Sequence, residues 1–214
     1  MLTLRQWQNT VKPQDLIIYN CSLPDGSDGW IQCPLGMSYQ FMQHRDTDMA
    51  QYQIGTHDQT VLCAISSDTD ARRRRNPKNR KSIIETLQRN GIKNTTIDSL
   101  DYFKTLPKYK FMVSPEGNGL DCHRHYESLM AGCIPIMERN IQIQDKYRDC
   151  PVLWTDDYSE ITEAYLESKY QEFLDTSYNF SCLLMPAYDD ISQQTIKQFG
   201  NWWGNRFTGK SWYL

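Results

Sequence analysis

Short apolar runs recur along the chain, and each is bounded by polar residues, glycine or proline. Apolar runs of this length predict short buried strands. They lie at 16–19, 60–65, 92–97, 110–114, 134–137 and 152–154. The stretch 21–36 is rich in glycine and proline, and it therefore predicts a loop.

Helical patterns separate these runs, and their ends carry residues that begin or stop helices. Asp121 is expected to cap a helix over 122–131, which Gly132 then stops. Another helix stops at Gly91 and begins either at Asn76-Pro77 or at Ser82. The remaining helices are expected at 4–11, at 100–106, from Asp157 or Ser159 to about 175, and at 191–199.

Strands and helices alternate from residue 58 to residue 176. This alternation predicts βαβ units, so the expected fold class is α/β, with a Rossmann-like parallel sheet flanked by helices. In such sheets, ligands bind outside the carboxyl ends of the strands. The loops that follow the expected strands are therefore where functional residues are expected.

The composition is that of an ordinary globular protein, and it excludes several classes. The 214 residues are 39% hydrophobic and 23% charged, with a formal net charge of −3, which excludes a disordered chain and a fibre. No apolar run reaches the ~18 residues that a membrane span needs, and the N-terminus lacks the apolar core of a signal peptide. Seven cysteines without regular spacing indicate reduced thiols and a cytoplasmic protein.

The segment 110–140 carries the clearest chemistry. Gly117 and Gly119 follow a strand and let the backbone approach a ligand closely. The first turn of the next helix offers free N–H groups and a partial positive charge to a phosphate. Arg124 adds a planar cation for a diphosphate, and the Glu127 carboxylate can accept hydrogen bonds from a ribose diol. These groups together describe a nucleotide-diphosphate-sugar site.

The same segment resembles a known family. It is similar to the donor-binding signature of the exostosin-like glycosyltransferases in the pattern Pro115-x-Gly117-x-Gly119, then Arg124-x-x-Glu127-x-Leu129-x-x-Gly132-Cys133-x-Pro135. The resemblance implies a GT-B architecture of two Rossmann-like halves, with the donor bound mainly by the C-terminal half. It also implies metal-independent transfer from a nucleotide sugar. In that transfer Gly117, Gly119 and Arg124 contact the diphosphate, and Glu127 holds the ribose.

The resemblance also assigns a role to each part of the chain. Residues 58–176 correspond to a Rossmann-like nucleotide-sugar-binding domain, and 1–57 to a reduced N-terminal segment on the acceptor side. Residues 177–214 hold the last helix and an aromatic tail that is expected to pack back on the sheet. Because 1–57 is short for a Rossmann half, the acceptor half is reduced, lies on a partner chain, or belongs to a longer protein of which this is a piece.

A cluster of cations follows the expected strand at 60–65, so it lies at the same sheet edge as the donor motif. Arg74, or Arg80 on the next helix, is expected to stabilise the leaving diphosphate, where negative charge develops during transfer. A solvated face without a ligand is the other interpretation of this cluster. The full expected donor-binding set is Ser66, Arg74, Ser114, Glu116, Gly117, Asn118, Gly119, Asp121, His123, Arg124 and Glu127.

Asp46-Thr-Asp48 and Asp68-Thr-Asp70 allow a second interpretation. In the GT-A fold, such acidic strings hold a divalent metal that bridges the diphosphate, whereas the GT-B interpretation has no metal ligands. A catalytic base must also deprotonate the acceptor hydroxyl. The expected catalytic residues are Asp28 and His44 as bases and Arg80 at the leaving group.

The leading prediction is a cytoplasmic hexosyl- or pentosyltransferase with no membrane span and no metal cofactor. It moves a sugar from a UDP-, GDP- or TDP-linked donor to a hydroxyl group of a glycan or a similar acceptor. The alternatives are a metal-dependent GT-A glycosyltransferase and a non-catalytic nucleotide-sugar-binding subunit.

Overall fold

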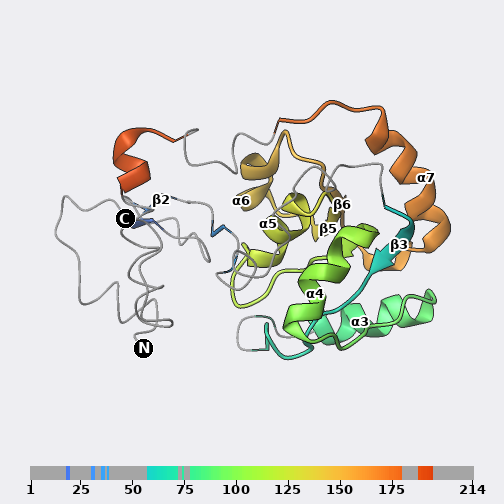
Figure 1. Cartoon of the computed structure of the whole chain (residues 1–214). Coiled ribbons are helices and arrows are strands. Elements are labelled where there is room, and N and C mark those ends of the chain that lie inside the picture. Colours follow the sequence, from blue (N-terminus) through green and yellow to red (C-terminus); the bar gives the residue numbers. More distant parts are fainter. Residues whose placement is uncertain are drawn as a thin grey trace.

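A four-stranded parallel sheet forms the centre of the described part of the chain (Figure 1). The computed structural model describes residues 18–19, 30–31, 35–36, 38, 57–71, 74, 78–179 and 188–194. Neighbouring strands are parallel throughout, which confirms the predicted α/β class. In their spatial order, the strands are β3 (Gln59–Leu62), β4 (Tyr109–Val113), β5 (Ile134–Glu138) and β6 (Leu153–Thr155).

The strand expected at 92–97 is reduced to a single bridge, so that prediction is wrong. Asn94 pairs with Cys63 in parallel, on the edge of β3 that β4 does not occupy. The Asn94 side chain replaces the backbone ladder there, because its Oδ1 accepts from the Ile65 N–H at 2.9 Å and its Nδ2 donates to the Ile65 carbonyl at 2.9 Å. One side-chain amide therefore satisfies both backbone groups that a longer strand would have paired.

This bridge reveals a change of winding direction between β3 and β4. From β3 the chain winds to Asn94 at one edge, and it then returns past β3 to β4 and continues to β6. Such a change creates a crevice at the carboxyl ends of the two strands that flank it. The loops after Leu62 and Val113 are therefore where a ligand is expected.

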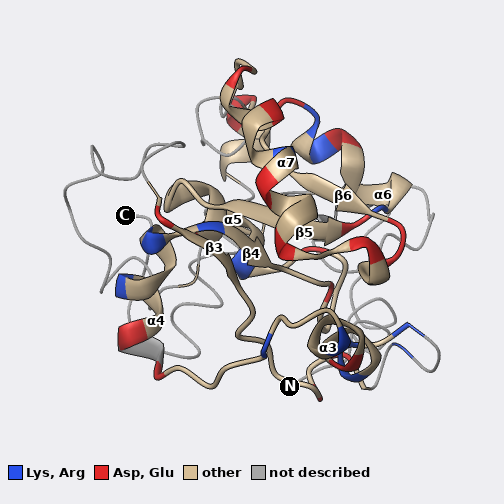
Figure 2. Cartoon of the chain, turned by 90° about the vertical axis from the view of Figure 1, so that its right-hand side faces the viewer, with Lys and Arg blue, Asp and Glu red and all other residues tan. Residues whose placement is uncertain are grey.

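Helices cover both faces of the sheet (Figure 1). α3 (Arg80–Arg89) and α7 (Glu163–Leu174) pack on one face. α4 (Ser99–Thr105), α5 (His123–Met130) and α6 (Ile141–Gln144) pack on the other. Figure 2 looks onto the side of α3 and α7 and shows acidic residues along α7 and basic residues on α3.

Alternate residues of the strands face opposite layers. Phe111 and Val113 belong to the core beneath α3 and α7, whereas Met112 between them packs with α4. Ile136 faces the first layer, and its neighbour Met137 packs with α5 and α6. Because both faces are buried, these strands are continuous apolar runs, which is the pattern that predicted them.

The starts of α3 and α5 differ from those predicted. α3 begins at Arg80 because Asn79 caps it, with the Asn79 Oδ1 accepting from the Ser82 N–H at 2.9 Å. Ser82 thus lies inside the helix rather than at its start. α5 has Cys122 as its N-cap and no side-chain cap, so the prediction that Asp121 caps it is wrong. The first turn of α5 therefore keeps backbone donors that no capping side chain engages.

The start of α7, the stops of two helices and the 3₁₀ turns complete the description of the helical segments. Thr162 caps α7, so a start at Asp157 or Ser159 is wrong; Asp157 instead caps η4, a single 3₁₀ turn over Tyr158–Glu160. Gly91 and Gly132 have positive φ values of 86° and 72°, which confirms both as helix stops. The other 3₁₀ turns in the described ranges are η2 (Leu106–Lys108) and η3 (Asp145–Tyr147).

Two short strands precede the sheet, β1 (Ile18–Tyr19) and β2 (Trp30–Ile31), and they pair in parallel. β1 confirms part of the strand predicted at 16–19, whereas β2 lies in a stretch predicted to be loop. Residues 190–194 are helical, within the last predicted helix. Other predictions lie outside the described residues: the helix at 4–11, the start at Asn76-Pro77, Asp28, His44, Asp46, Asp48 and the aromatic tail.

Candidate functional site

The candidate site lies where β3 and β4 end, at the change of winding direction. The loop 114–121 leaves β4, and α5 begins beside it. The Arg124 Nη2 donates to the Ala64 carbonyl at 3.2 Å, which joins the first turn of α5 to the segment after β3. The structure therefore brings together the glycine-containing loop, α5 and the chain that follows β3.

Ser114 and His125 fix α5 to the end of β4. The His125 Nε2 donates to the Leu120 carbonyl at 3.3 Å, so its Nδ1 accepts the Ser114 hydroxyl at 2.7 Å. Both residues are buried. Burial lowers the pKa of His125 to about 4, so the ring is neutral at pH 7. Ser114, which was expected at the donor, therefore has a positioning partner within the fold.

The glycine-containing loop approaches another part of the protein closely. A Cβ at Gly117 would lie 3.0 Å from the Arg80 Nη2, which is tighter than most real Cβ contacts, so the guanidinium would have to shift by a few tenths of an ångström. The Gly117 N–H donates to the Gly119 carbonyl at 2.9 Å, and the Glu116 N–H donates to Glu138 Oε2 at 3.0 Å. These two amides are therefore engaged within the fold, and glycine at 117 makes room for a guanidinium.

Arg80 is buried beneath this loop. Its Nε donates to the Glu116 carbonyl at 2.8 Å and its Nη2 to the Pro115 carbonyl at 3.1 Å. Burial, reinforced by the charge of Arg124, lowers the pKa of Arg80, but a guanidinium keeps its charge at neutral pH. Arg80, predicted from the cation cluster, thus places a fixed positive charge directly at the loop of the donor motif.

Arg124 supplies a second positive charge at the start of α5. Its guanidinium lies 5.9 Å from the centre of the Tyr102 ring, and its Nη2 contacts Ala64. Its Nε is buried and has no hydrogen-bond partner among the described residues. Burying a donor without a partner costs free energy. The unsatisfied Nε therefore marks a place where an anionic oxygen would be stabilised.

Glu127, the predicted ribose ligand, is buried, and Ser38 contacts it. Ser38 donates to Glu127 Oε1 from its N–H at 3.3 Å and from its hydroxyl at 2.5 Å. One turn earlier, the His123 Nδ1 donates to the Gly36 carbonyl at 2.7 Å. These N-terminal residues therefore lie along the α5 face that His123 and Glu127 share through their i, i+4 spacing.

Asp121 is a buried hub rather than a ligand at the site surface. Its carboxylate accepts the Tyr126 and Tyr147 hydroxyls, each at 2.6 Å, and the Lys146 Nζ at 2.9 Å. It also accepts the Leu35 N–H at 3.0 Å, which anchors the segment that covers α5. Burial alone would raise the pKa of Asp121, but Lys146 and the tyrosine hydroxyls overcome it and hold the pKa below its ordinary value.

The remaining predicted donor residues have diverse surroundings. Ser66 and Asn118 are exposed at the site edge. Arg74 pairs with Glu138 at 2.7 Å on the α3 side of the sheet. Glu116 is buried and accepts the Asn140 amide at 2.9 Å. Of the predicted residues, Arg80, Arg124 and Glu127 are those that the structure places at the start of α5 or beside it.

Two of the acidic side chains considered as metal ligands fall in the described part of the chain. Asp68 accepts the Ser67 hydroxyl at 2.9 Å, and Asp70 accepts the Arg80 N–H at 2.8 Å. Asp70 also lies 3.6 Å from the Arg74 guanidinium. Within the described ranges, no three His, Cys, Asp or Glu side chains gather as a metal site. Asp70 thus anchors the start of α3.

Sequence reasoning missed two residues of the site region. Ser38 engages Glu127 from 89 residues away, and nothing in the pattern around Ser38 indicates this contact. Glu138 pairs with Arg74 and accepts the Glu116 N–H. Its position at the carboxyl end of β5 could have identified it, because ligand-facing residues of such sheets lie at those ends.

The chain matches no protein family model, and no curated protein matches it. Over the described ranges, none of the helices combines the length and apolarity needed to cross a membrane. Function is therefore inferred from the site itself.

Proposed function

We propose that this protein is a glycosyltransferase that binds a nucleotide-diphosphate sugar at the N-terminus of α5. The observation that carries the proposal is the pair of guanidinium groups at this point. Arg124 has a buried Nε without a partner among the described residues, and Arg80 lies beneath the adjoining loop. Burial and, after it, the charge of Arg124 lower the pKa of Arg80, which indicates that the two like charges are neighbours. An anion between them would relieve this repulsion.

The diphosphate is the part of the donor that these groups suit best. α5 has no side-chain cap, and the His125 N–H already donates to the Cys122 carbonyl at 3.0 Å. The partial positive charge of the helix start and the N–H groups before His125 are the features that suit an anion. Arg124 lies within that first turn and adds a full charge. A planar guanidinium pairs with two phosphate oxygens at once. The combination favours a diphosphate over a neutral ligand.

Glu127 is proposed to hold the ribose. Ser38 donates two hydrogen bonds to its Oε1, which is the type of contact that a ribose diol makes with a carboxylate. Glu127 lies one turn beyond Arg124 on the same helix. A diphosphate at the start of α5 therefore brings an attached ribose toward the carboxylate, and the diol replaces Ser38 there.

In the proposed transfer, an acceptor hydroxyl of a glycan or a similar molecule attacks the anomeric carbon of the donor sugar. The bond from that carbon to the diphosphate oxygen breaks, and the diphosphate leaves with the electron pair. Arg80 and Arg124 stabilise the negative charge that develops there, and no metal is required. The acceptor proton passes to a base, for which Asp28 and His44 are the proposed candidates.

Binding of the donor tests this proposal directly. Titration with UDP-, GDP- and TDP-sugars, each with and without Mn²⁺, should give metal-independent binding of one nucleotide class. Arg124→Ala should weaken that binding about tenfold or more, because it removes a charge-assisted contact. Arg148→Ala is the matched control, since the Arg148 side chain is 72% exposed. Equal binding by parent and Arg124→Ala would refute the site, and a strict Mn²⁺ requirement would favour the GT-A mechanism.

A transfer assay separates an enzyme from a binding subunit. The chain that binds a donor is incubated with it and with glycan acceptors, and release of the nucleoside diphosphate is measured. Acceptor-dependent release indicates catalysis by this chain. Binding without release would indicate a nucleotide-sugar-binding subunit that needs a partner chain for the acceptor.

A further inference from the structure

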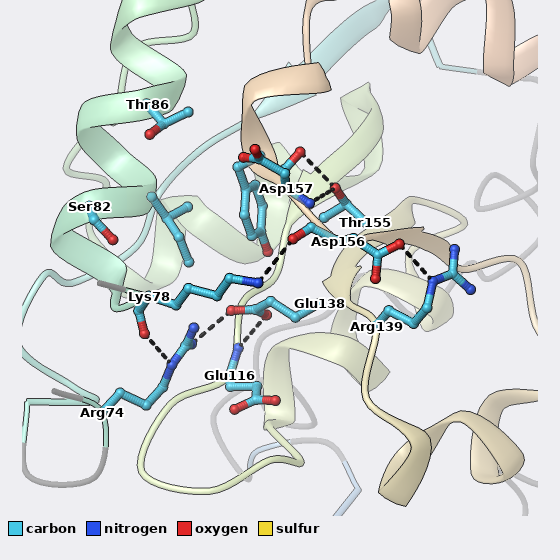
Figure 3. A pocket seen from close by; sticks show the side chains of 12 residues that line it. Arg74, Lys78, Ser82, Thr86, Glu116, Glu138, Arg139, Thr155, Asp156 and Asp157 are labelled. Carbon is cyan, nitrogen blue, oxygen red and sulfur yellow. Dashed lines mark hydrogen bonds and ion pairs between the residues drawn. The ribbon is translucent and has the colours of Figure 1, made fainter. Parts of the chain in front are cut away.

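A cleft lies on the face of the sheet that α3 covers, whereas α5 covers the other face. It opens between α3, η4 and the carboxyl ends of β5 and β6, and its volume is about 360 Å³ (Figure 3). Pockets for small molecules commonly have volumes of ~300–1,000 Å³. The residues that matter for its chemistry are Arg74, Ile83, Thr86, Glu116, Glu138 and Tyr158.

An ion pair is held in place at the wall of this cleft. The Arg74 Nη1 and Glu138 Oε1 are 2.7 Å apart, and their side chains are only 11% and 15% exposed. The Arg74 Nε also donates to the Lys78 carbonyl at 2.8 Å, and Glu138 Oε2 accepts the Glu116 N–H. Figure 3 shows the Arg74 and Glu138 side chains pointing toward each other beside the cleft. The cleft thus presents a fixed donor group next to a fixed acceptor group.

Tyr158 contributes a buried hydroxyl to the cleft. The residue is only 6% exposed, it lines the cleft, and its hydroxyl has no hydrogen-bond partner among the described residues. The Glu138 carboxylate acts on Tyr158 by its charge and by a side-chain contact that does not reach full hydrogen-bond geometry. Burial, followed by the Glu138 charge, raises the pKa of Tyr158, so the hydroxyl keeps its proton and remains a donor.

The charges around the cleft disfavour a simple ion as its occupant. Charged side chains of both signs line it: Arg74, Lys78, Arg139, Glu116, Glu138, Asp156 and Asp157. A compact ion of either sign would therefore approach like charges. Like charges in contact repel strongly when water is partly excluded from between them. Neutral groups that both donate and accept hydrogen bonds meet neither penalty.

We propose that this cleft binds an uncharged saccharide. Each sugar hydroxyl has one donor and two acceptor positions, so a pair of hydroxyls can accept from Arg74 and donate to Glu138 simultaneously. The Tyr158 hydroxyl gains its missing partner in the same complex. The Ile83 side chain, buried at the cleft wall, contacts the apolar C–H face of the sugar ring. This site goes beyond the nucleotide-sugar function, because sugar binding here requires neither a nucleotide nor Arg124 and Glu127.

Direct titration tests the proposal without any nucleotide. The whole chain is titrated with glucose, galactose, mannose, xylose and N-acetylglucosamine, and binding is followed by calorimetry and by saturation-transfer NMR. At least one sugar should bind at millimolar concentration. Tyr158→Phe should weaken that binding about fivefold to tenfold, as expected for one lost hydrogen bond. Tyr165→Phe, on α7 and outside the cleft lining, should leave it unchanged.

Stability measurements distinguish a ligand-binding hydroxyl from a structural one. Because the Tyr158 hydroxyl has no partner in the described structure, Tyr158→Phe should leave the Tm unchanged or raise it. A lower Tm would indicate a structural role and would count against the proposal. Thr86→Phe on α3 should fill the cleft and abolish sugar binding, whereas Gln88→Phe on the exposed side of the same helix should not. If Tyr158→Phe fails to fold, the comparison of Thr86→Phe with Gln88→Phe still tests whether the sugar binds in the cleft.

Three results would overturn the proposal. The first is the absence of binding by the folded parent protein for every sugar tested. The second is sugar binding that survives both Tyr158→Phe and Thr86→Phe, which would place the sugar elsewhere. The third is stronger binding of inorganic phosphate in the cleft, lost in Thr86→Phe, which would make it an anion site.

Discussion

Replacing Asp121 by asparagine should destabilise the protein by about 3–5 kcal/mol, the usual cost of removing one partner from a buried ion pair. The carboxylate is 2% exposed, and the Lys146 side chain that it neutralises is 8% exposed. Asparagine would remove the carboxylate charge that neutralises the buried Lys146 side chain. Its amide NH₂ would also face a donor, because the carboxylate accepts from Lys146, from two tyrosine hydroxyls and from the Leu35 N–H.

Chemical denaturation of the parent and of Asp121→Asn measures this cost. The matched control is Asp145→Asn, which removes an ion pair with Arg148. The Asp145 side chain is 87% exposed. That control should change the unfolding free energy by less than about 1 kcal/mol. A loss below about 1 kcal/mol for Asp121→Asn would refute the interpretation of Asp121 as the hub that holds α5 and the segment at Leu35.

Three further predictions concern stability and pH. Gly117→Ala should lower the unfolding free energy by about 1–3 kcal/mol, because its Cβ would lie 3.0 Å from Arg80; an unchanged denaturation midpoint would contradict this packing. Asn94→Leu should cost about 1–3 kcal/mol by leaving the Ile65 N–H and carbonyl unpaired, which denaturation also measures. Lowering the pH from 6.5 to about 4 should reduce stability by about 3 kcal/mol, because folded His125 has a pKa of about 4 and binds its proton later than in the unfolded chain. His125→Gln should remove most of that pH dependence, and a slope that persists would contradict the assignment.

The sheet could be predicted from the sequence because its strands are buried on both faces. β4 and β5 are continuous apolar runs that end in polar or charged residues, and that pattern needs no knowledge of partners. The helix stops at Gly91 and Gly132 could also be predicted from local sequence, because each depends on a positive φ that glycine adopts readily. The segment at Asn94 was mispredicted because its pairing depends on one side chain contacting Ile65, 29 residues away.

The candidate site could be predicted only in part. The spacing of Arg124 and Glu127 on one helix is local, so the sequence sufficed to select them. The partner of Glu127 could not be predicted, because Ser38 lies 89 residues earlier in a stretch without a pattern. Asp121 was predicted to cap α5 because aspartate is a common cap residue. Its carboxylate instead accepts hydrogen bonds from Lys146 and Tyr147 in the core, and these long-range contacts could not be predicted from the sequence.

A crystal structure of the chain with bound nucleoside diphosphate is the most direct test of the proposed site. UDP, GDP and TDP are soaked or co-crystallised, and the complex is compared with the free protein. The diphosphate should contact Arg124 and the first-turn N–H groups of α5, and the ribose hydroxyls should occupy Glu127 in place of Ser38. A nucleotide bound elsewhere, or a complex in which Ser38 keeps Glu127 and the Arg124 Nε stays unpaired, would contradict the proposal.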